Sequence, residues 1–230
     1  LISVQKTLAD DMIETIINPV CDTALTVMTN PRRVVLHDIY KKGWIELQDA
    51  ASQAVAALIP AKGRVLDFCA GGGGKCLAVS ARTGGLVFAH DANPNRMSEI
   101  KVRALRGGHD IDVILPDQID EYGQFDSIFC DLPCSGSGAW RRSPEEKWSL
   151  TQADILEYQK LQREILVKAE GFVELGGTLS MITCSIFNAE NQAQRDFLLG
   201  KFKSLKIISE NQYLPTENND GLYNVVLQKS

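Results

Sequence analysis

The chain has 230 residues, of which 44% are hydrophobic and 23% are charged, as in an ordinary folded domain. Its formal net charge of −5 at pH 7 argues against a protein that coats nucleic acid non-specifically, although it does not exclude a local cationic groove. No apolar run approaches the ~20 residues that span a bilayer, and no signal peptide opens the chain, so we expect a cytoplasmic protein with no membrane partner.

The first 42 residues predict a small N-terminal appendage, and residues 43–230 predict the main domain. The stretch "LADDMIETII" (8–17) is typical of a short helix. The change of pattern at Asn30–Pro31 is abrupt and suggests that residues are missing there. The apolar spacing of "WIELQDAASQAVAALI" (44–59) predicts a helix that covers an edge of the main domain.

From Arg64 onwards, strand and helix patterns alternate. Buried strands are predicted at 64–70, 85–92, 111–116, 125–133 and 176–185, and a closing hairpin at 205–210 and 222–229. Helices are predicted at 71–82, 94–108, 151–173 and 189–202. This alternation indicates an α/β fold: a Rossmann-like, doubly wound, mostly parallel sheet of seven strands. Ligands of such sheets bind beyond the carboxyl ends of the strands.

A glycine-rich turn follows the first of these strands and opens a helix. Backbone N–H groups in such a turn approach a ligand closely, and the helix N-terminus favours negative charge. The residues that we expect to contact a cofactor there are Cys69, Ala70, Gly71, Gly72, Gly73, Gly74 and Lys75. Asp91 ends the next strand, where a carboxylate can bind a ribose, and Asp117 follows the third strand, near an adenine.

This combination fits either NAD or S-adenosyl-L-methionine. Leu77 stands where the third glycine of a dinucleotide motif would be, which favours the methyl donor. A plain tight turn with an aspartate cap, and a solvated loop acid at Asp117, are the structural alternatives.

Two cysteines follow neighbouring predicted strands. Cys134 lies in "DLPCSGSG" and Cys184 in "MITCS", so both are expected at one rim of the sheet. A lone cysteine is more often an inert small hydrophobic residue, but two at adjacent strand ends beside a cofactor turn favour a nucleophile. No cysteine pair has C-x-x-C spacing and the histidines lie outside metal-ligand spacing, so we expect no metal site.

Four segments, in order, resemble the signatures of the Sun/RsmB-like RNA cytosine-5 methyltransferases (NOL/NOP/Sun type). They are "IELQDAASQAVA", "VLDFCAGGGGK", "FDSIFCDLPCSGSGAWRRSPEEKW" and "GGTLSMITCSIFNAENQ". The resemblance runs from about Gly43 to Gly200. It implies a methyltransferase domain that uses S-adenosyl-L-methionine and acts on RNA, ribosomal more than transfer, as a monomer.

The resemblance also implies roles for individual residues. Cys184 would attack carbon 6 of the cytosine, Cys134 would promote release of the product, and Asp131 would hydrogen-bond ring nitrogen 3 and border the cofactor. Arg141, Arg142 and Lys147 could neutralise RNA phosphates. Trp148 could stack on a base, although we expect it to be buried.

The chain departs from the family pattern at three points. Gly71–Gly72 replaces the usual Ala–Pro of the cofactor loop, and Leu132 replaces the commoner Ala before Pro133. The family's N-terminal RNA-binding region is expected to be short or absent, which affects substrate affinity more than chemistry.

Other functions are compatible with parts of the pattern. A DNA cytosine-5 methyltransferase would use Cys134 as nucleophile, but its Glu-Asn-Val segment is missing, because "AENQ" follows Cys184 instead. An NAD-dependent oxidoreductase would need the third glycine. A catalytically weak RNA-binding or ribosome-assembly factor would be expected to lose Cys184 or Asp131, and both are present.

Overall fold

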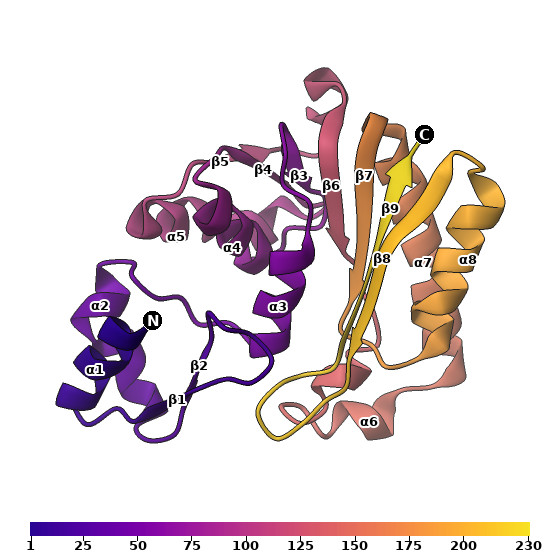
Figure 1. Cartoon of the computed structure of the whole chain (residues 1–230). Coiled ribbons are helices and arrows are strands. Elements are labelled where there is room, and N and C mark those ends of the chain that lie inside the picture. Colours follow the sequence, from indigo (N-terminus) through magenta and orange to yellow (C-terminus); the bar gives the residue numbers. More distant parts are fainter.

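Seven strands form the central sheet of the computed structural model, which describes all residues from 1 to 230. They are β3 (Val65–Asp67), β4 (Val87–His90), β5 (Ile111–Ile114), β6 (Phe125–Asp131), β7 (Val173–Thr183), β8 (Leu205–Tyr213) and β9 (Leu222–Lys229). Their order is β5-β4-β3-β6-β7-β9-β8 (Figure 1). The five strands from β5 to β7 are parallel, and β9 is antiparallel to both of its neighbours. The predicted doubly wound sheet is confirmed.

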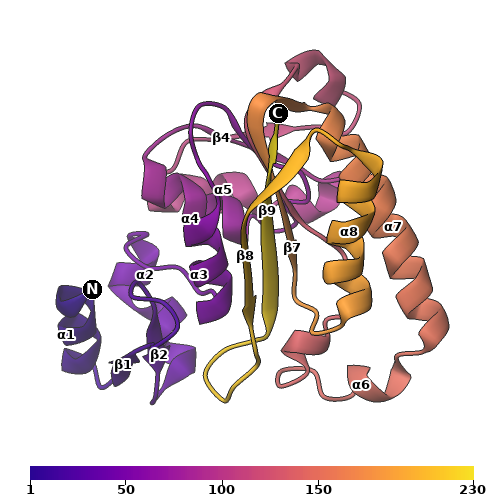
Figure 2. The same ribbon diagram turned by 45° about the vertical axis from the view of Figure 1, so that its right-hand side comes forward.

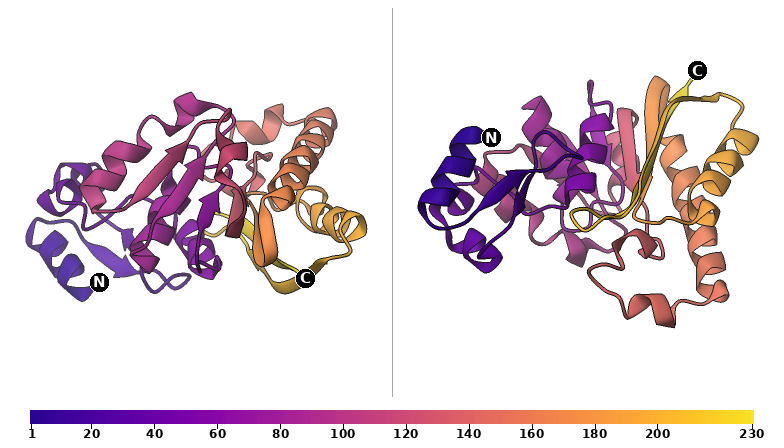
Figure 3. Two further views of the ribbon diagram at one scale, coloured as in Figure 1. Left: turned by 90° about the horizontal axis from the view of Figure 1, so that it is seen from above. Right: turned by 60° about the horizontal axis from the view of Figure 1, so that its bottom comes forward.

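Helices cover both faces of this sheet (Figures 2 and 3). One face carries α3 (Ala50–Leu58), α4 (Gly74–Thr83) and α5 (Ile100–Gly107), and the other carries α7 (Gln152–Gly171) and α8 (Gln192–Lys201). Each face has its own apolar core: one of 15 buried residues under α3 to α5, and one of 19 under α7 and α8. Because both faces of the sheet are buried, the parallel strands have continuous apolar sequences rather than an alternating pattern.

The shorter helical segments lie in the connections. They are η1 (Pro31–Leu36), α2 (Asp38–Lys41), η2 (Pro94–Met97), η3 (Ile119–Tyr122), η4 (Ser137–Ala139), α6 (Glu146–Ser149) and η5 (Asn188–Glu190). Helix α7 begins where the sequence predicts, because Thr151 and Asp154 form a reciprocal capping box. None of the helices combines the length and the apolar character that a bilayer crossing requires.

The appendage differs from its prediction. Helix α1 spans Ile2–Asp10, and Thr15–Ile17 (β1) pairs antiparallel with Leu25–Val27 (β2), so the helix predicted over 8–17 is wrong. Met12 has a left-handed backbone with φ of 62°, which ends the helix. The Thr-Ile-Ile run that follows is β-branched and favours a strand. At Asn30–Pro31 the chain continues through a left-handed Asn30 directly into η1.

Helix α3 begins at Ala50, six residues later than the apolar spacing predicts. Asp49 is its N-cap, because the carboxylate accepts a hydrogen bond from the Ala51 N–H at 2.9 Å. The residues before it cross over to α5, where Glu46 forms ion pairs with Arg103 and Arg106. This crossing segment joins the appendage to the main domain.

Candidate active site

The predicted site residues meet at the carboxyl ends of β3, β6 and β7. Strand β3 lies between β4 and β6, so the chain connections depart in opposite directions from this point, where doubly wound sheets bind ligands. Strands β6 and β7 are parallel neighbours, with Asp131 paired opposite Ile182. Cys134 follows the first strand by three residues and Cys184 follows the second directly, so the register brings the two thiols together.

The sulfur atoms of Cys134 and Cys184 are 3.3 Å apart, within hydrogen-bond range for sulfur, and both cysteines are free and half-buried. The hydrogen bond from Cys134 lowers the pKa of Cys184; burial and Asp131 oppose this, and Lys75 adds to it. The pKa of Cys134 is raised well above its usual range by the same hydrogen bond and by burial. Cys184 is therefore the more acidic thiol of the pair, and Cys134 is the donor when Cys184 is ionised.

A buried ion pair lies beside the thiols. Lys75 Nζ is 2.7 Å from Asp131 Oδ2, and the Lys75 side chain is only 10% exposed. Burial alone would lower the pKa of Lys75, but the Asp131 carboxylate outweighs it and raises that pKa, so the ammonium stays charged. Asp67, at the end of β3, is buried behind this pair. Burial, together with the charge of Asp131, raises the pKa of Asp67 well above its usual range.

The glycine turn and Asp91 form one hydrogen-bonded unit. Asp91 is buried; its Oδ2 accepts the Gly71 N–H at 2.9 Å, and its Oδ1 accepts the Asn93 N–H at 2.9 Å. A carboxylate has about four lone-pair sites, and these two N–H groups occupy two of them. Arg96 Nη1 lies 3.3 Å from the same carboxylate. Asp117 is exposed in the loop after β5, away from these hydrogen bonds.

Backbone hydrogen bonds and core packing hold the other residues of the glycine turn at the carboxyl ends of the strands. Ala70 is buried, and its N–H donates to the His90 carbonyl, which ties the turn to the end of β4. Cys69 packs against the core under α7, and the Gly73 N–H closes the turn on the Ala70 carbonyl. Gly74 begins α4, which places Lys75 in the first turn of that helix.

The three predicted RNA-binding cations have different surroundings. Arg141 and Arg142 form ion pairs with the buried Asp220 of the β8–β9 loop, at 3.1 and 2.5 Å. Arg141 also lies 3.5 Å from Asp49, the cap of α3. Lys147 instead faces aromatic rings, with its Nζ 5.5 Å from the centre of the Trp148 ring.

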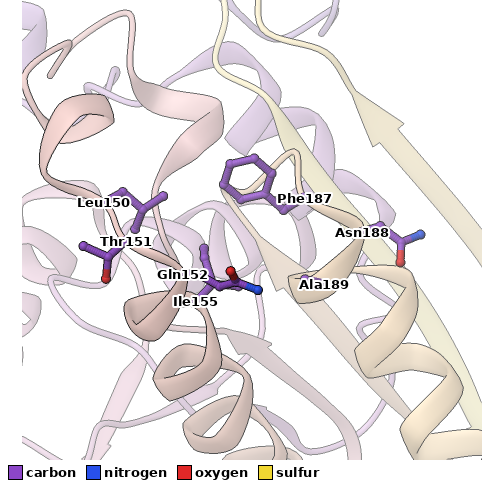
Figure 4. Close-up of a pocket in the computed structure, with 7 residues that line it drawn as sticks. All are labelled: Leu150, Thr151, Gln152, Ile155, Phe187, Asn188 and Ala189. Atoms are coloured by element: carbon purple, nitrogen blue, oxygen red, sulfur yellow. The ribbon is translucent and has the colours of Figure 1, made fainter.

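Trp148 is 84% exposed, so the expectation that it is buried is wrong. It lies in the four-residue helix α6 at the molecular surface, where no core element covers it. An apolar pocket of about 480 Å³ lies next to this helix, between the start of α7 and the loop after Cys184 (Figure 4). Its lining residues are Leu150, Thr151, Gln152, Ile155, Phe187, Asn188 and Ala189.

Several residues of the site were not anticipated from the sequence. Three of the buried carboxylates, Asp67, Asp220 and Glu190, were not singled out. For Glu190 a signal was present, because it is the acid of the "AENQ" segment that distinguishes the chain from the DNA enzymes. Within the chain, no group of three or more His, Cys, Asp or Glu side chains is arranged to hold a metal ion.

The strand order and this rim define the class of Rossmann-like methyltransferases. The fold superimposes on a methyltransferase homologue from Pyrococcus horikoshii with a TM-score of 0.80 and 25% identity, over 99% of this chain and 82% of that one. The crystal structure of PH0851 gives a TM-score of 0.92 with 25% identity, over 100% of this chain and 57% of that one.

The family follows from sequence comparison. The model of the 16S rRNA methyltransferase RsmB/F family matches residues 55–227, and the chain belongs to this family. It is 37% identical over 167 residues to ribosomal RNA small subunit methyltransferase B of Sodalis glossinidius, covering 67% of this chain and 38% of that protein. The corresponding protein of Vibrio cholerae is 35% identical over 205 residues, covering 83% and 47%. The chain thus spans less than half the length of these two relatives.

Proposed function

We propose that this protein transfers the methyl group of S-adenosyl-L-methionine to carbon 5 of a cytosine in ribosomal RNA, through a covalent bond between Cys184 and the base. One observation carries the proposal: a thiol pair 3.3 Å apart, in which the pKa of Cys184 is lowered, beside the Lys75–Asp131 ion pair. Family membership and the names of the relatives support the ribosomal substrate over transfer RNA. The place of action in this proposal is the cytoplasm, because the named relatives are bacterial ribosomal RNA methyltransferases.

The residues of the turn fit the methyl donor. Asp91 holds the ribose hydroxyls with its free lone pairs, and the turn from Cys69 to Gly74 surrounds the amino acid part. Asp131 and Asp117 border the adenosine side, of which Asp117 is the weaker candidate because it is exposed. The bound cofactor supplies an electrophilic methyl group on a sulfonium.

Carbon 5 of cytosine is too weak a nucleophile to take this methyl group unaided. The Cys184 thiolate adds to carbon 6, and the electron density displaced into the ring makes carbon 5 nucleophilic. As negative charge builds at ring nitrogen 3, a proton passes to that nitrogen through the Asp131 carboxyl group. The Lys75 ammonium, 2.7 Å from Asp131, supplies this proton.

Product release requires two bonds to break after methyl transfer. The carbon-5 proton passes to water, and its electron pair re-forms the ring double bond. The Cys184–carbon-6 bond then breaks to regenerate the thiolate, and the nitrogen-3 proton returns to Lys75 through Asp131. Cys134, whose S–H faces the Cys184 sulfur, promotes this step. The target base has to be unstacked to reach the thiols, which costs a few kcal/mol in a duplex and favours RNA loops.

A covalent trap tests the proposal. The protein is incubated with S-adenosyl-L-methionine and small-subunit ribosomal RNA containing 5-fluorocytidine, and adducts are resolved on denaturing gels. Fluorine cannot leave as the proton does, so the wild-type protein is expected to accumulate an adduct and Cys184→Ala none. With ordinary RNA, Cys134→Ala is expected to retain an adduct that the wild type releases.

Each alternative function has its own result in this experiment. An adduct that depends on Cys134 rather than Cys184 would indicate the arrangement of a DNA cytosine-5 methyltransferase. Equal trapping on transfer RNA transcripts would refute the ribosomal assignment. RNA binding without any adduct or methylation would indicate an RNA-binding assembly factor that retains the fold.

A further inference from the structure

A buried carboxylate connects the two loops that carry the thiols. Glu190 is fully buried, and it accepts hydrogen bonds from the Ser135 N–H at 2.8 Å and the Ser135 hydroxyl at 2.5 Å. It also accepts hydrogen bonds from the Ser185 hydroxyl at 2.6 Å and from the Gln162 amide at 3.3 Å. Ser135 follows Cys134 in the chain and Ser185 follows Cys184, so one carboxylate holds the residue after each thiol.

The bonds around Glu190 form a closed network between the same two loops. The Gly138 N–H donates to the Cys184 carbonyl at 2.9 Å, and the Ile186 N–H donates to the Ser137 hydroxyl at 3.0 Å. The next residue, Asn191, donates from its amide to the Ser185 carbonyl at 2.9 Å. The loops after β6 and β7 are therefore joined by several independent bonds, of which those to Glu190 are nearest to both cysteines in sequence.

Burying a carboxylate without a neighbouring cation destabilises the fold. No ion pair involves Glu190, and its four hydrogen-bond donors come from the thiol loops and from α7. Apolar packing of the same volume is often at least as stabilising as a buried charge. Most of the hydrogen bonds to Glu190 come from the thiol loops. The presence of a carboxylate here is therefore better explained by the geometry that it imposes on these loops than by a gain in stability.

We propose that Glu190 is a positioning residue that fixes the two thiol loops so that the Cys134 S–H donates to the Cys184 sulfur. Glu190 touches neither the base nor the cofactor and acts only through Ser135 and Ser185. The inference deepens the proposed function and rests on it for its consequence, because the thiol that Glu190 prepares is the one assigned to attack the base.

The charge on Cys184 reports this geometry without any RNA. If the loops shift, Cys184 loses the hydrogen bond that contributes most to lowering its pKa, and burial and Asp131 then raise that pKa. Both thiols also respond to other groups around them. These groups are Asp131, Lys75 and Arg142 near Cys184, and Glu190 and Tyr158 near Cys134.

The test measures the rate at which iodoacetamide alkylates Cys184 as a function of pH, by peptide mass spectrometry on the full chain. Glu190→Gln keeps the size of the side chain but replaces one acceptor oxygen by a donor. Either the two serine hydroxyls, or the Ser135 N–H and the Gln162 amide, then lose their acceptor. We expect the midpoint for Cys184 to move to higher pH. The rate at pH 7 should fall about tenfold for every pH unit by which the midpoint rises, because the thiolate is the reactive form.

Glu170→Gln is the matched control. Glu170 is also buried, but it pairs with Lys229 at 3.0 Å at the far end of α7. This substitution is expected to lower the thermal stability and to leave the Cys184 profile unchanged. If Glu190→Gln also lowers stability without moving the Cys184 profile, Glu190 is merely structural and the proposal is overturned.

A second variant decides the case if Glu190→Gln does not fold. The double substitution Ser135→Ala and Ser185→Ala removes both hydroxyls from the carboxylate and leaves Glu190 in place. An upward shift of the Cys184 midpoint supports the proposal, and a wild-type profile overturns it. Because neither outcome uses RNA, a wild-type protein that forms no adduct would refute the proposed function and leave this result standing.

Discussion

Lys75 is the nearest cation that lowers the pKa of Cys184, and it pairs with Asp131 at the same time. Removing its charge takes a favourable partner from the thiolate and leaves the Asp131 carboxylate, which raises the Cys184 pKa, uncompensated. We therefore expect Lys75→Met to raise the pKa of Cys184, so that alkylation and methyl transfer fall at neutral pH and recover as pH rises. Methyl transfer at pH 7 should fall roughly 10²-fold or more.

The matched variant is Lys75→Arg, which keeps the positive charge. It should hold the midpoint of the Cys184 alkylation profile close to that of the wild type. If both variants shifted the midpoint equally, packing rather than charge would be the cause. The measurement is the pH dependence of alkylation at Cys184 and of methyl incorporation into RNA.

The two glycines that replace the family's Ala–Pro have different roles. Gly71 has a φ of +50°, and a methyl group added to it would come within 3.1 Å of Arg96 Nη2. Gly72 has no positive φ, and the only contact of an added methyl group is Arg103 Nη1 at 3.5 Å. We expect Gly71→Ala to lower the free energy of unfolding by about 1–2 kcal/mol, and Gly72→Ala to change it little.

Chemical unfolding of the two single variants, without cofactor, tests this difference. Titration with S-adenosyl-L-methionine should then show weaker binding for Gly71→Ala, because the Gly71 N–H that holds Asp91 is displaced. Equal stability of both variants would mean that the turn adopts the ordinary backbone that the Ala–Pro pattern implies.

At the scale of elements, the segment between β6 and α7 carries two cations with different surroundings. Arg142 is held by the buried Asp220, whereas Lys147 in α6 has no ion pair and lies against two tryptophan rings. A cation that is already neutralised contributes little to the release of counterions from RNA. We expect Lys147→Ala to reduce the slope of log affinity against log salt by about 0.7, the value for one phosphate of a single strand.

Arg142→Ala is the comparison, and it should leave that slope nearly unchanged while it lowers the free energy of unfolding. Filter binding of the RNA at several salt concentrations measures the slope, and thermal unfolding measures stability. A loss of one phosphate contact in Arg142→Ala would show that RNA displaces Asp220 from the arginine.

These two cations also show where sequence reasoning stops. The strands and their connections were predictable, because each parallel strand is a short apolar run bounded by turn residues and each helix has its own periodicity or cap. Whether Arg141 faces solvent or Asp220, 79 residues away, depends on how the β8–β9 loop packs, and no local pattern encodes that. The same holds for Glu190, whose partner Ser135 is 55 residues distant.

At the scale of the whole molecule, the appendage has a small core of its own. Its four buried residues are Leu8, Ile13, Val34 and Ile39. It contacts the main domain through an apolar cluster, in which Cys21 and Ala24 pack with residues of α3, and through Tyr40, whose ring lies 4.1 Å from the Arg106 guanidinium. The boundary at residue 42 stays a prediction, and the helix predicted within the appendage is wrong, since its β-branched end pairs with a strand.

We expect Leu8→Ala to unfold the appendage locally. A large-to-small change in a buried core costs about 2–5 kcal/mol, and a core of only four buried residues does not offset that loss of stability. Amide hydrogen exchange should become faster within residues 1–42, while the Cys184 alkylation profile stays that of the wild type. Leu166→Ala, in the core under α7, should instead destabilise the sheet as a whole. If Leu8→Ala accelerated exchange equally throughout the sheet, the appendage and the main domain would form a single cooperative unit, and the boundary at residue 42 would have no energetic meaning.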